Sequence, residues 1–463
     1  MRLFFSGYII IVYMHKPYIK PVFTASPDFK MREPKISGLV IFVAHLIGRF
    51  YLFFALGIAR MVIRNGRPLY EAYARALAGK SRCIVAFRHP NGGEAQILMW
   101  LILFVLRRKA RKAGIKFCRR PYVSFIYGYE VARWGGKWAR YIMPGTGAMP
   151  IYHSKIDTAA MNRIFEAITN GPYPIAIAPE GQVSYTTESV PRLEQGTVRI
   201  GFHAAERLQN QDKDCPLEIL PISIHFRYGS MGRWSLNKLV RKIEKYTGFK
   251  QDGAGFTERL RRARDFILEQ NEKRYNIAPQ KDQNFSDRVN TIMEIALGKA
   301  ETILGIKNIS NDLIERLYTI RQICWDRMVI PGITNLNHLT MVERSLLDLN
   351  AGEAWYASRH MELVDFVWYF RVPVPAEDAP LYVKIEYTQN LWDFVNRTMG
   401  GAYTNRVLNV HPKRVLIQIG SSINLSERLN DYKKDKKKAI AAAMKDMEKN
   451  FLDCISCAEE YQI

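Results

Sequence analysis

The chain has 463 residues, of which 48% are hydrophobic, so it exceeds one ordinary domain and can form either two units or one domain with a large insertion. Its net charge of +23 favours an anionic partner, namely nucleic acid, an acidic membrane surface or a phosphorylated substrate. The six cysteines are scattered, which argues against a disulfide framework and favours a reducing compartment. Cys454 and Cys457 form a lone Cys-x-x-Cys pair without the further ligands that zinc needs, so we expect no metal site.

Residues 1–70 are predicted to form an N-terminal segment that associates with a membrane. Residues 1–14 resemble the start of a signal peptide, but no small-residue cleavage site follows them. An uncleaved apolar tail and a start codon assigned too early are the alternatives. Residues 38–59 are mostly apolar and are long enough to span a bilayer.

The polar residues in and after this apolar stretch indicate how it would meet the membrane. His45, Arg49, Arg60 and Arg64 fall on one stripe at the helical angle per residue. This favours a helix over 38–59 that lies in the interface on the cytoplasmic face, with its cations toward the lipid phosphates. A spanning helix and an ordinary buried helix are the alternatives, and a central Arg would cost a spanning helix about 2.5–3.5 kcal/mol.

A strand, a tight turn and a helix follow one another around residue 89. Ile84–Phe87 is an apolar run typical of a buried strand, a Pro-Asn-Gly-Gly turn comes next, and Glu94 opens an apolar helix over 95–106. This order places His89 and Glu94 at the mouth of an α/β sheet, where such proteins usually bind ligands. Because an imidazole that a carboxylate orients can take a proton from a hydroxyl, both residues are predicted to be catalytic.

The His-x4-acid spacing alone is not specific, because the composition gives roughly one such match by chance. Two others occur, His338 with Glu343 and His360 with Asp365. Neither has a Gly or Pro between its members, and five residues span about 140° around a helix, so these side chains should diverge. The two glycines before Glu94 instead allow the backbone to turn back and the pair to converge.

A second site motif is expected further along the chain. A glycine-rich loop and a short strand are predicted to end at the polar residues His153 and Lys155, and 157–169 is predicted to be an amphipathic helix. Tyr173–Ala178 is predicted to be a second buried strand, and Pro179, Glu180 and Gly181 follow it directly. An acidic residue between Pro and Gly at a strand end is well placed to bind a ligand hydroxyl or to pair with a cation.

The rest of the chain changes character twice. Leu217–Tyr228 alternates as a third strand should, whereas 231–350 is helical and basic and 361–403 is aromatic-rich and mixed. Arg414–Gly420 is again predicted to be a strand, and a charged helix over 425–461 ends the chain. The expected fold is therefore an α/β sheet flanked by helices, with an N-terminal apolar helix and a large, mostly helical insertion.

Four of these segments resemble, in order, the motifs of the glycerolipid acyltransferase family, which includes the bacterial 1-acylglycerol-3-phosphate acyltransferases. His89 and Glu94 look like its His-x4-Asp motif, and residues 147–153 look like its Gly-x-x-aromatic-x-x-Arg segment. Residues 178–184 look like its Phe-Pro-Glu-Gly-Thr-x-Ser motif, and 220–224 look like its strand with an early proline.

The resemblance also implies how the chain is divided. It implies an acyltransferase α/β core over 71–230, a helical or mixed insertion over 231–410, and a closing strand with the C-terminal helix of the core over 411–463. Three departures from the family pattern concern the site. Glu94 stands where the family has Asp and is one methylene longer, His153 stands where the family has Arg, and Gln182 stands where the family has Thr.

The resemblance to this family implies direct acyl transfer without a bound cofactor. His89, oriented by Glu94, would deprotonate a hydroxyl of a (lyso)glycerophospholipid such as 1-acylglycerol-3-phosphate. The resulting oxygen would attack the thioester of a co-substrate, either acyl-CoA or acyl carrier protein. The residues that the resemblance assigns to substrate binding are Glu180, Gly181, Ser184, His153 and Lys155.

Other functions stay open from the sequence. A lipid esterase or phospholipase would use the same site with water as the acceptor, and a catalytically degenerate relative would bind lipid without turnover. A basic nucleic-acid-binding protein would explain the charge, but no recognition motif is visible and the two strand-end motifs would have no role. We therefore expect an anionic membrane surface, a lysophospholipid and an acyl donor as partners, and no nucleic acid.

Overall fold

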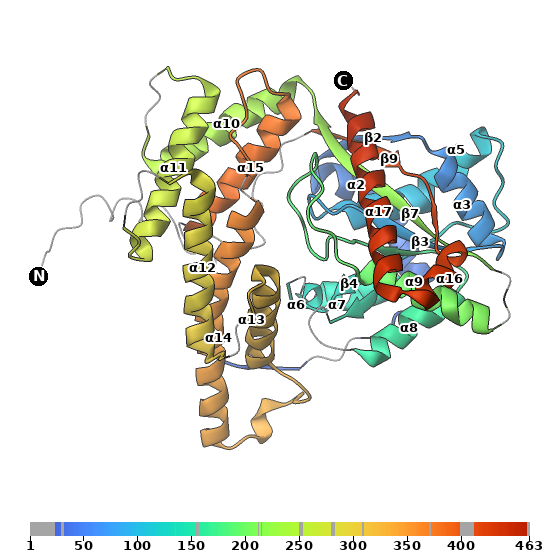
Figure 1. Cartoon of the computed structure of the whole chain (residues 1–463), viewed down its shortest axis with the longest axis horizontal. Coiled ribbons are helices and arrows are strands. Elements are labelled where there is room, and N and C mark those ends of the chain that lie inside the picture. The colour runs from blue at the N-terminus through green and yellow to red at the C-terminus, as the bar shows by residue number, and fades with distance from the viewer. Residues whose placement is uncertain are drawn as a thin grey trace, which may run out of the picture. The chain divides into compact units, whose positions relative to one another are not determined.

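The computed structural model describes residues 24–28, 32–134, 136–152, 157–211, 213, 215–249, 253–278, 283–307, 310–369, 372–398 and 412–460. The chain divides into two compact units. One, formed by residues 31–231 and 411–463, contains a mixed sheet flanked by helices (Figure 1). The other, formed by residues 1–30 and 232–410, is helical. The predicted α/β class is confirmed.

The sheet brings the carboxyl ends of several strands to one edge. Parallel strands β7, β3, β6, β4 and β5 lie side by side in this order, and β9 pairs antiparallel with β7 and parallel with β2. The edge where β3, β6 and β7 end is therefore also the edge where β9 and β2 begin. The bounds are β2 Ile58–Arg64, β3 Arg82–Phe87, β4 Ser124–Gly128, β5 Met149–Ile151, β6 Ile175–Ile177, β7 Leu217–Tyr228, β9 Lys413–Ile419 and β10 Ile423–Asn424, which pairs with β7.

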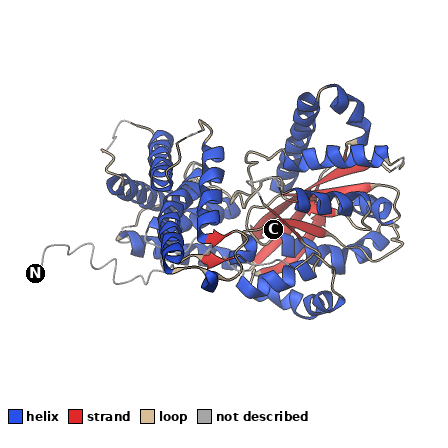
Figure 2. Cartoon of the chain, turned by 90° about the horizontal axis from the view of Figure 1, so that it is seen from below, coloured by secondary structure: helices blue, strands red, loops and turns tan. Residues whose placement is uncertain are grey.

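Helices cover both faces of the sheet, as Figure 2 shows. Along β3, Val85 and Phe87 pack on one face with α2, α3 and α4, whereas Ile84 and Ala86 pack on the other face with α8, α9 and α17. This alternation is the period-2 pattern of a strand buried on both sides. The helix bounds are α2 Gly38–Phe54, α3 Arg67–Leu77, α4 Glu94–Trp100, α5 Arg107–Lys112, α6 Val131–Trp134, α7 Gly136–Gly145, α8 Thr158–Thr169, α9 Gly196–Asn210, α16 Leu429–Lys434 and α17 Lys436–Glu459.

The helix expected over 38–59 is shorter than predicted, because α2 ends at Phe54. Gly57 has a φ of +68°, a left-handed conformation that glycine adopts without a Cβ penalty, and it turns the chain into β2. Arg60 and Arg64 therefore lie on a strand, and the predicted stripe of four polar residues along one helix is wrong. Arg49 donates hydrogen bonds to the carbonyls of residues 58 and 59 at 3.3 and 2.8 Å. No helix in the described part of the chain combines the length and apolarity that crossing a membrane requires.

The helix that follows the His89 turn changes its winding. It begins as α4, continues as a π-helix over Leu101–Leu106, and ends as α5. The predicted helix over 95–106 is thus present, with a wider turn in its second half. Such π segments are rare and are often found near functional sites.

The helical unit consists of α10 to α15 and a small two-stranded sheet of β1 and β8. Most of the described part of 361–403, for which mixed character was expected, lies in α14 and α15. Guanidinium–carboxylate pairs link successive helices with N–O distances of 2.6–2.9 Å: Arg259 with Glu244, Arg288 with Glu272, and Arg316 with Glu301. The bounds are β1 Ser26–Pro27, α10 Ser230–Thr247, α11 Phe256–Arg274, α12 Phe285–Leu304, α13 Leu313–Met328, β8 Val329–Ile330, α14 Met341–Tyr369 and α15 Leu381–Thr398.

Candidate active site

The turn after β3 contains two adjacent glycines, and the first has a backbone conformation that favours glycine. Gly92 has a φ of +95°, in the region that favours glycine, and its N–H donates to Glu94 Oε2 at 2.8 Å. Gly93 lies under Leu56, and a Cβ on this glycine would come within 3.2 Å of that side chain. The turn therefore folds back on itself and delivers Glu94 to the start of α4 beside the end of β3.

His89 and Glu94 form a hydrogen-bonded pair. His89 Nδ1 lies 2.7 Å from Glu94 Oε2, so the extra methylene of Glu94 is accommodated. Glu94 is fully buried, whereas the His89 side chain is 22% exposed, so the imidazole is the member of the pair that reaches the surface. Because a carboxylate only accepts hydrogen bonds, the proton of a neutral ring lies on Nδ1 and the lone pair lies on Nε2.

The surroundings of His89 set its protonation. Burial lowers the pKa of His89, but the hydrogen bond and the charge of Glu94, with the charge of Glu180, outweigh burial and raise this pKa above its ordinary value of 6.5. If neutral His89 is the base, kcat/KM should rise with pH through a midpoint above 6.5. Glu94→Gln removes the charge that raises the pKa, so its midpoint should move to lower pH. Titration of the His89 ring by NMR gives the same pKa independently of turnover, and a wild-type value at or below 6.5 would contradict this account.

Glu180 lies at the end of β6 as predicted, and its carboxylate is held inside the protein. Its side chain is 1% exposed, and Oε1 accepts from Arg88 Nε at 2.8 Å. Oε2 accepts from the backbone N–H of His89 at 2.9 Å. In the structure, Glu180 therefore positions the His89 backbone, and its direct contact with a substrate stays a prediction.

The other residues of this second motif continue the same contact. The N–H of Gly181 donates to the Ala178 carbonyl at 3.2 Å, which closes a turn. The N–H of Ser184 donates to the His89 carbonyl at 3.0 Å, and its buried hydroxyl lies 3.4 Å from the Thr186 carbonyl. Both backbone polar groups of His89 are thus bound by residues 180–184. The predicted substrate residues His153 and Lys155 lie outside the described residues.

Two residues of the site were missed by sequence reasoning. Arg88 follows an apolar strand directly, and the alternation of a strand places it on the face opposite His89, which was a usable signal. Lys413 starts β9, is 1% exposed, and brings its Nζ to 3.4 Å from Asn91 Oδ1 in the turn. The same Nζ lies 5.1 Å from the centroid of the Phe226 ring, a cation–π contact. No local pattern indicated Lys413, because Asn91 is 322 residues away in the chain.

The two other His-x4-acid spacings have different partners. His360 Nδ1 lies 2.8 Å from the hydroxyl of Tyr275, and Glu343 accepts from the backbone N–H and the hydroxyl of Thr340, both at 2.8 Å. The Asp365 side chain lies outside the described residues, so the expectation that its spacing does not converge stays a prediction.

No model of a known protein family matches the chain, and no curated protein matches its sequence.

Proposed function

We propose that the protein is an O-acyltransferase that moves a fatty acyl group from acyl-CoA or acyl carrier protein to a hydroxyl of a (lyso)glycerophospholipid. The observation that carries the proposal is the 2.7 Å pair of His89 and Glu94 at the carboxyl edge of the sheet. The pair has a buried carboxylate, a partly exposed imidazole and a backbone fixed by Glu180. Such an arrangement suits a general base better than a core histidine, which would have no exposed ring.

The proposed step balances without a covalent intermediate on the protein. His89 Nε2 accepts the proton of the acceptor hydroxyl while that oxygen forms a bond to the thioester carbonyl carbon. The carbon–sulfur bond then breaks, and the thiolate of the donor takes the proton from the imidazolium as it leaves. The products are the acylated lipid and the free thiol. Glu94 accepts the hydrogen bond from Nδ1 and stabilises the imidazolium between the two transfers.

The test is incubation of the purified protein with radiolabelled acyl-CoA, or with labelled acyl carrier protein, and a panel of lysolipids. Label in a phospholipid supports the proposal. Label in free fatty acid but in no lipid would replace it with an esterase or phospholipase, which uses water as the acceptor. Lipid binding with no label transfer would indicate a degenerate relative. Retention on DNA at moderate salt, with none on anionic vesicles, would favour a nucleic-acid-binding protein.

The proposed substrates are lipids, and we propose that α2 carries the protein onto an anionic membrane surface. Leu56, just after this helix, packs on Gly93 of the catalytic turn. Much of α2 is both apolar and exposed. Soluble monomers rarely expose a large apolar patch without a binding role, and an amphipathic helix can lie in the interface of a bilayer. The large apolar residues of α2 that are 41–73% exposed are Leu39, Phe42, Val43, Leu46, Ile47, Phe50, Tyr51, Phe53 and Phe54.

Charged residues on this helix should prevent docking. Phe42→Asp with Phe50→Asp removes two large apolar contacts, so partition onto vesicles that contain anionic lipid should fall by about tenfold or more in flotation assays. Leu452→Asp is the matched control, because Leu452 is a 48% exposed apolar residue of α17 in the same unit. Unchanged binding of the double variant would exclude α2 as the docking element, and equal losses in both proteins would point to a general effect of added negative charge.

A further inference from the structure

The loop between β6 and α9 has an unusual degree of order. Residues 178–195 contain neither a helix nor a strand. Loops longer than about 12–15 residues without regular structure are uncommon in compact domains and are usually functional or disordered. In this loop Glu180, Ser184, Thr186 and Thr187 are buried. The loop is therefore held by specific contacts, and its first part is the segment that binds both backbone groups of His89.

Those contacts come from the sheet face opposite His89. Val85 and Phe87 share a core with Ile224 and Phe226, and the Phe87 and His89 rings lie 5.9 Å apart on this side. Alternation places the neighbours of these residues, Arg88, His225 and Arg227, on the other face. Arg227 Nη2 donates to the carbonyl of Ala458 at 2.8 Å, so this other face lies under α17.

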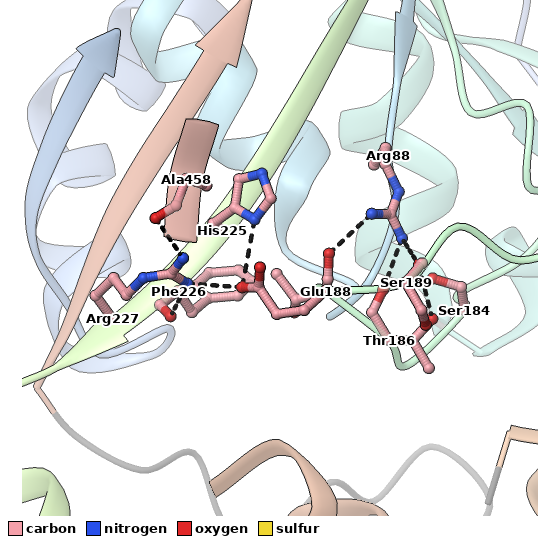
Figure 3. Close-up of polar contacts among 10 residues, drawn as sticks. Arg88, Ser184, Thr186, Glu188, Ser189, His225, Phe226, Arg227 and Ala458 are labelled. Atoms are coloured by element: carbon pink, nitrogen blue, oxygen red, sulfur yellow. Dashed lines mark hydrogen bonds and ion pairs between the residues drawn. The ribbon is translucent and has the colours of Figure 1, made fainter. Parts of the chain in front are cut away.

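Arg88 is the first anchor of the loop, and Figure 3 shows its guanidinium pointing into it. It is fully buried, and Nη1 donates to the Thr187 carbonyl at 2.8 Å. Nη2 donates to the carbonyls of Thr186 at 2.8 Å and of Ser189 at 2.6 Å. One side chain thus satisfies three buried or half-buried carbonyls that a loop cannot satisfy by itself.

Glu188 is the second anchor, and its side chain leaves the loop toward Arg227 and His225 of β7 (Figure 3). Glu188 Oε1 accepts from Arg227 Nη1 at 2.6 Å and lies 3.4 Å from His225 Nδ1. Burial alone would raise the pKa of Glu188, but His225 and Arg227 outweigh it and hold this pKa below its ordinary value. The carboxylate therefore stays charged, and the guanidinium that binds it also binds the C-terminal helix.

We propose that Glu188 is a positioning residue for the catalytic base: by pinning the loop to β7 and α17 behind the sheet, it fixes residues 180–184 and, through them, His89. Its role in turnover rests on the proposed function, whereas its effect on the loop does not. The effect of Glu188 on His89 is transmitted along the loop backbone through Thr187 and Thr186 to Ser184, whose N–H binds the His89 carbonyl. Misplacement of a base by about 1 Å can cost as much as 100-fold in rate.

The test compares Glu188→Gln with Glu218→Gln. Glu218 lies on β7 and, like Glu188, pairs with an arginine: its carboxylate accepts from Arg75 Nη2 at 2.8 and 2.9 Å. It lies at the end of the strand opposite the loop. Both variants lose one carboxylate charge that pairs with an arginine, on side chains that are 13% and 8% exposed, so similar falls in melting temperature are expected. Only Glu188→Gln should speed amide hydrogen exchange at Ser184 and residues 186–189, by about tenfold or more relative to β7 amides. Only Glu188→Gln should lower kcat by about tenfold, with KM changed less.

The outcomes separate this proposal from the proposed function. Unchanged loop exchange in Glu188→Gln would overturn the positioning role even in an active enzyme. If the wild type shows no acyl transfer but Glu188→Gln still exchanges its loop amides faster, the anchoring role of Glu188 stands and the proposed acyltransferase reaction is rejected. If Glu188→Gln does not fold, Arg227→Lys serves instead, because lysine keeps the buried charge but cannot bind Glu188 and the Ala458 carbonyl in the same fork geometry. Equal loop exchange in Arg227→Lys and wild type would likewise overturn the proposal.

Discussion

Replacement of His89 by Ala is expected to lower the rate of acyl transfer by about 10²–10⁴-fold, the range that a positioned general base contributes. The imidazole is the partly exposed group of the pair with Glu94, and no second base replaces it in the proposed step. The variant should still fold and bind vesicles, because the ring is partly exposed and the Glu94 carboxylate keeps the hydrogen bond from the Gly92 N–H. The measurement is initial rate with labelled acyl-CoA and lysolipid, together with circular dichroism and vesicle flotation.

His203→Ala is the matched control for this prediction. His203 lies on α9 in the same unit, and its side chain is 52% exposed with Glu206 at 3.6 Å. It should retain wild-type turnover. Activity retained by His89→Ala would remove the whole site assignment, since Glu94, Glu180 and Ser184 are assigned through this residue.

Replacement of Arg88 by Met is expected to cost about 3–5 kcal/mol of unfolding free energy, the usual cost of removing one partner of a buried ion pair. The Arg88 and Glu180 side chains are 0% and 1% exposed, so the carboxylate would lose its cation partner in the interior. Three loop carbonyls would lose their donor as well. Urea denaturation followed by circular dichroism measures the loss.

Arg67→Met provides the comparison for Arg88. Arg67 pairs with Glu71 on the surface, with side chains 78% and 42% exposed, so this variant should unfold at nearly the wild-type urea concentration. A loss for Arg88→Met as small as that for Arg67→Met would mean that Glu180 finds another partner or takes up a proton, and that the pair does not hold the loop.

Local order along the chain made part of this site predictable. The strand, glycine turn and helix around His89 follow one another without interruption from Arg82 to Trp100, so periodicity and turn chemistry were sufficient to place the pair. Glu180 was also placed correctly at a strand end, but the identity of its partner depends on which face each side chain takes. Arg88 lies on the opposite face from His89, and that alternation was already visible in the strand.

The errors have equally specific causes. Residues 38–59 are mostly apolar, and an apolar run alone does not separate a helix from a following strand. The division lies at Gly57, whose left-handed φ ends the helical region, and in the pairing of β2 with β9, a strand more than 300 residues away. Lys413 was missed because its neighbours in space, Asn91 and Phe226, are far from it in the chain. Contacts between such distant segments carry no local pattern.

The register of β7 and β9 has a consequence for which insertions and deletions this chain can accept during evolution. Tyr228 and Lys413 are opposite each other in one antiparallel ladder, and everything between them leaves and re-enters the sheet at that single rung. Two antiparallel neighbours can be joined by a turn of only two residues. The strand order and register of the sheet are therefore independent of the length of the excursion, so this position can accept, exchange or lose a module while every backbone ladder around His89 stays in place.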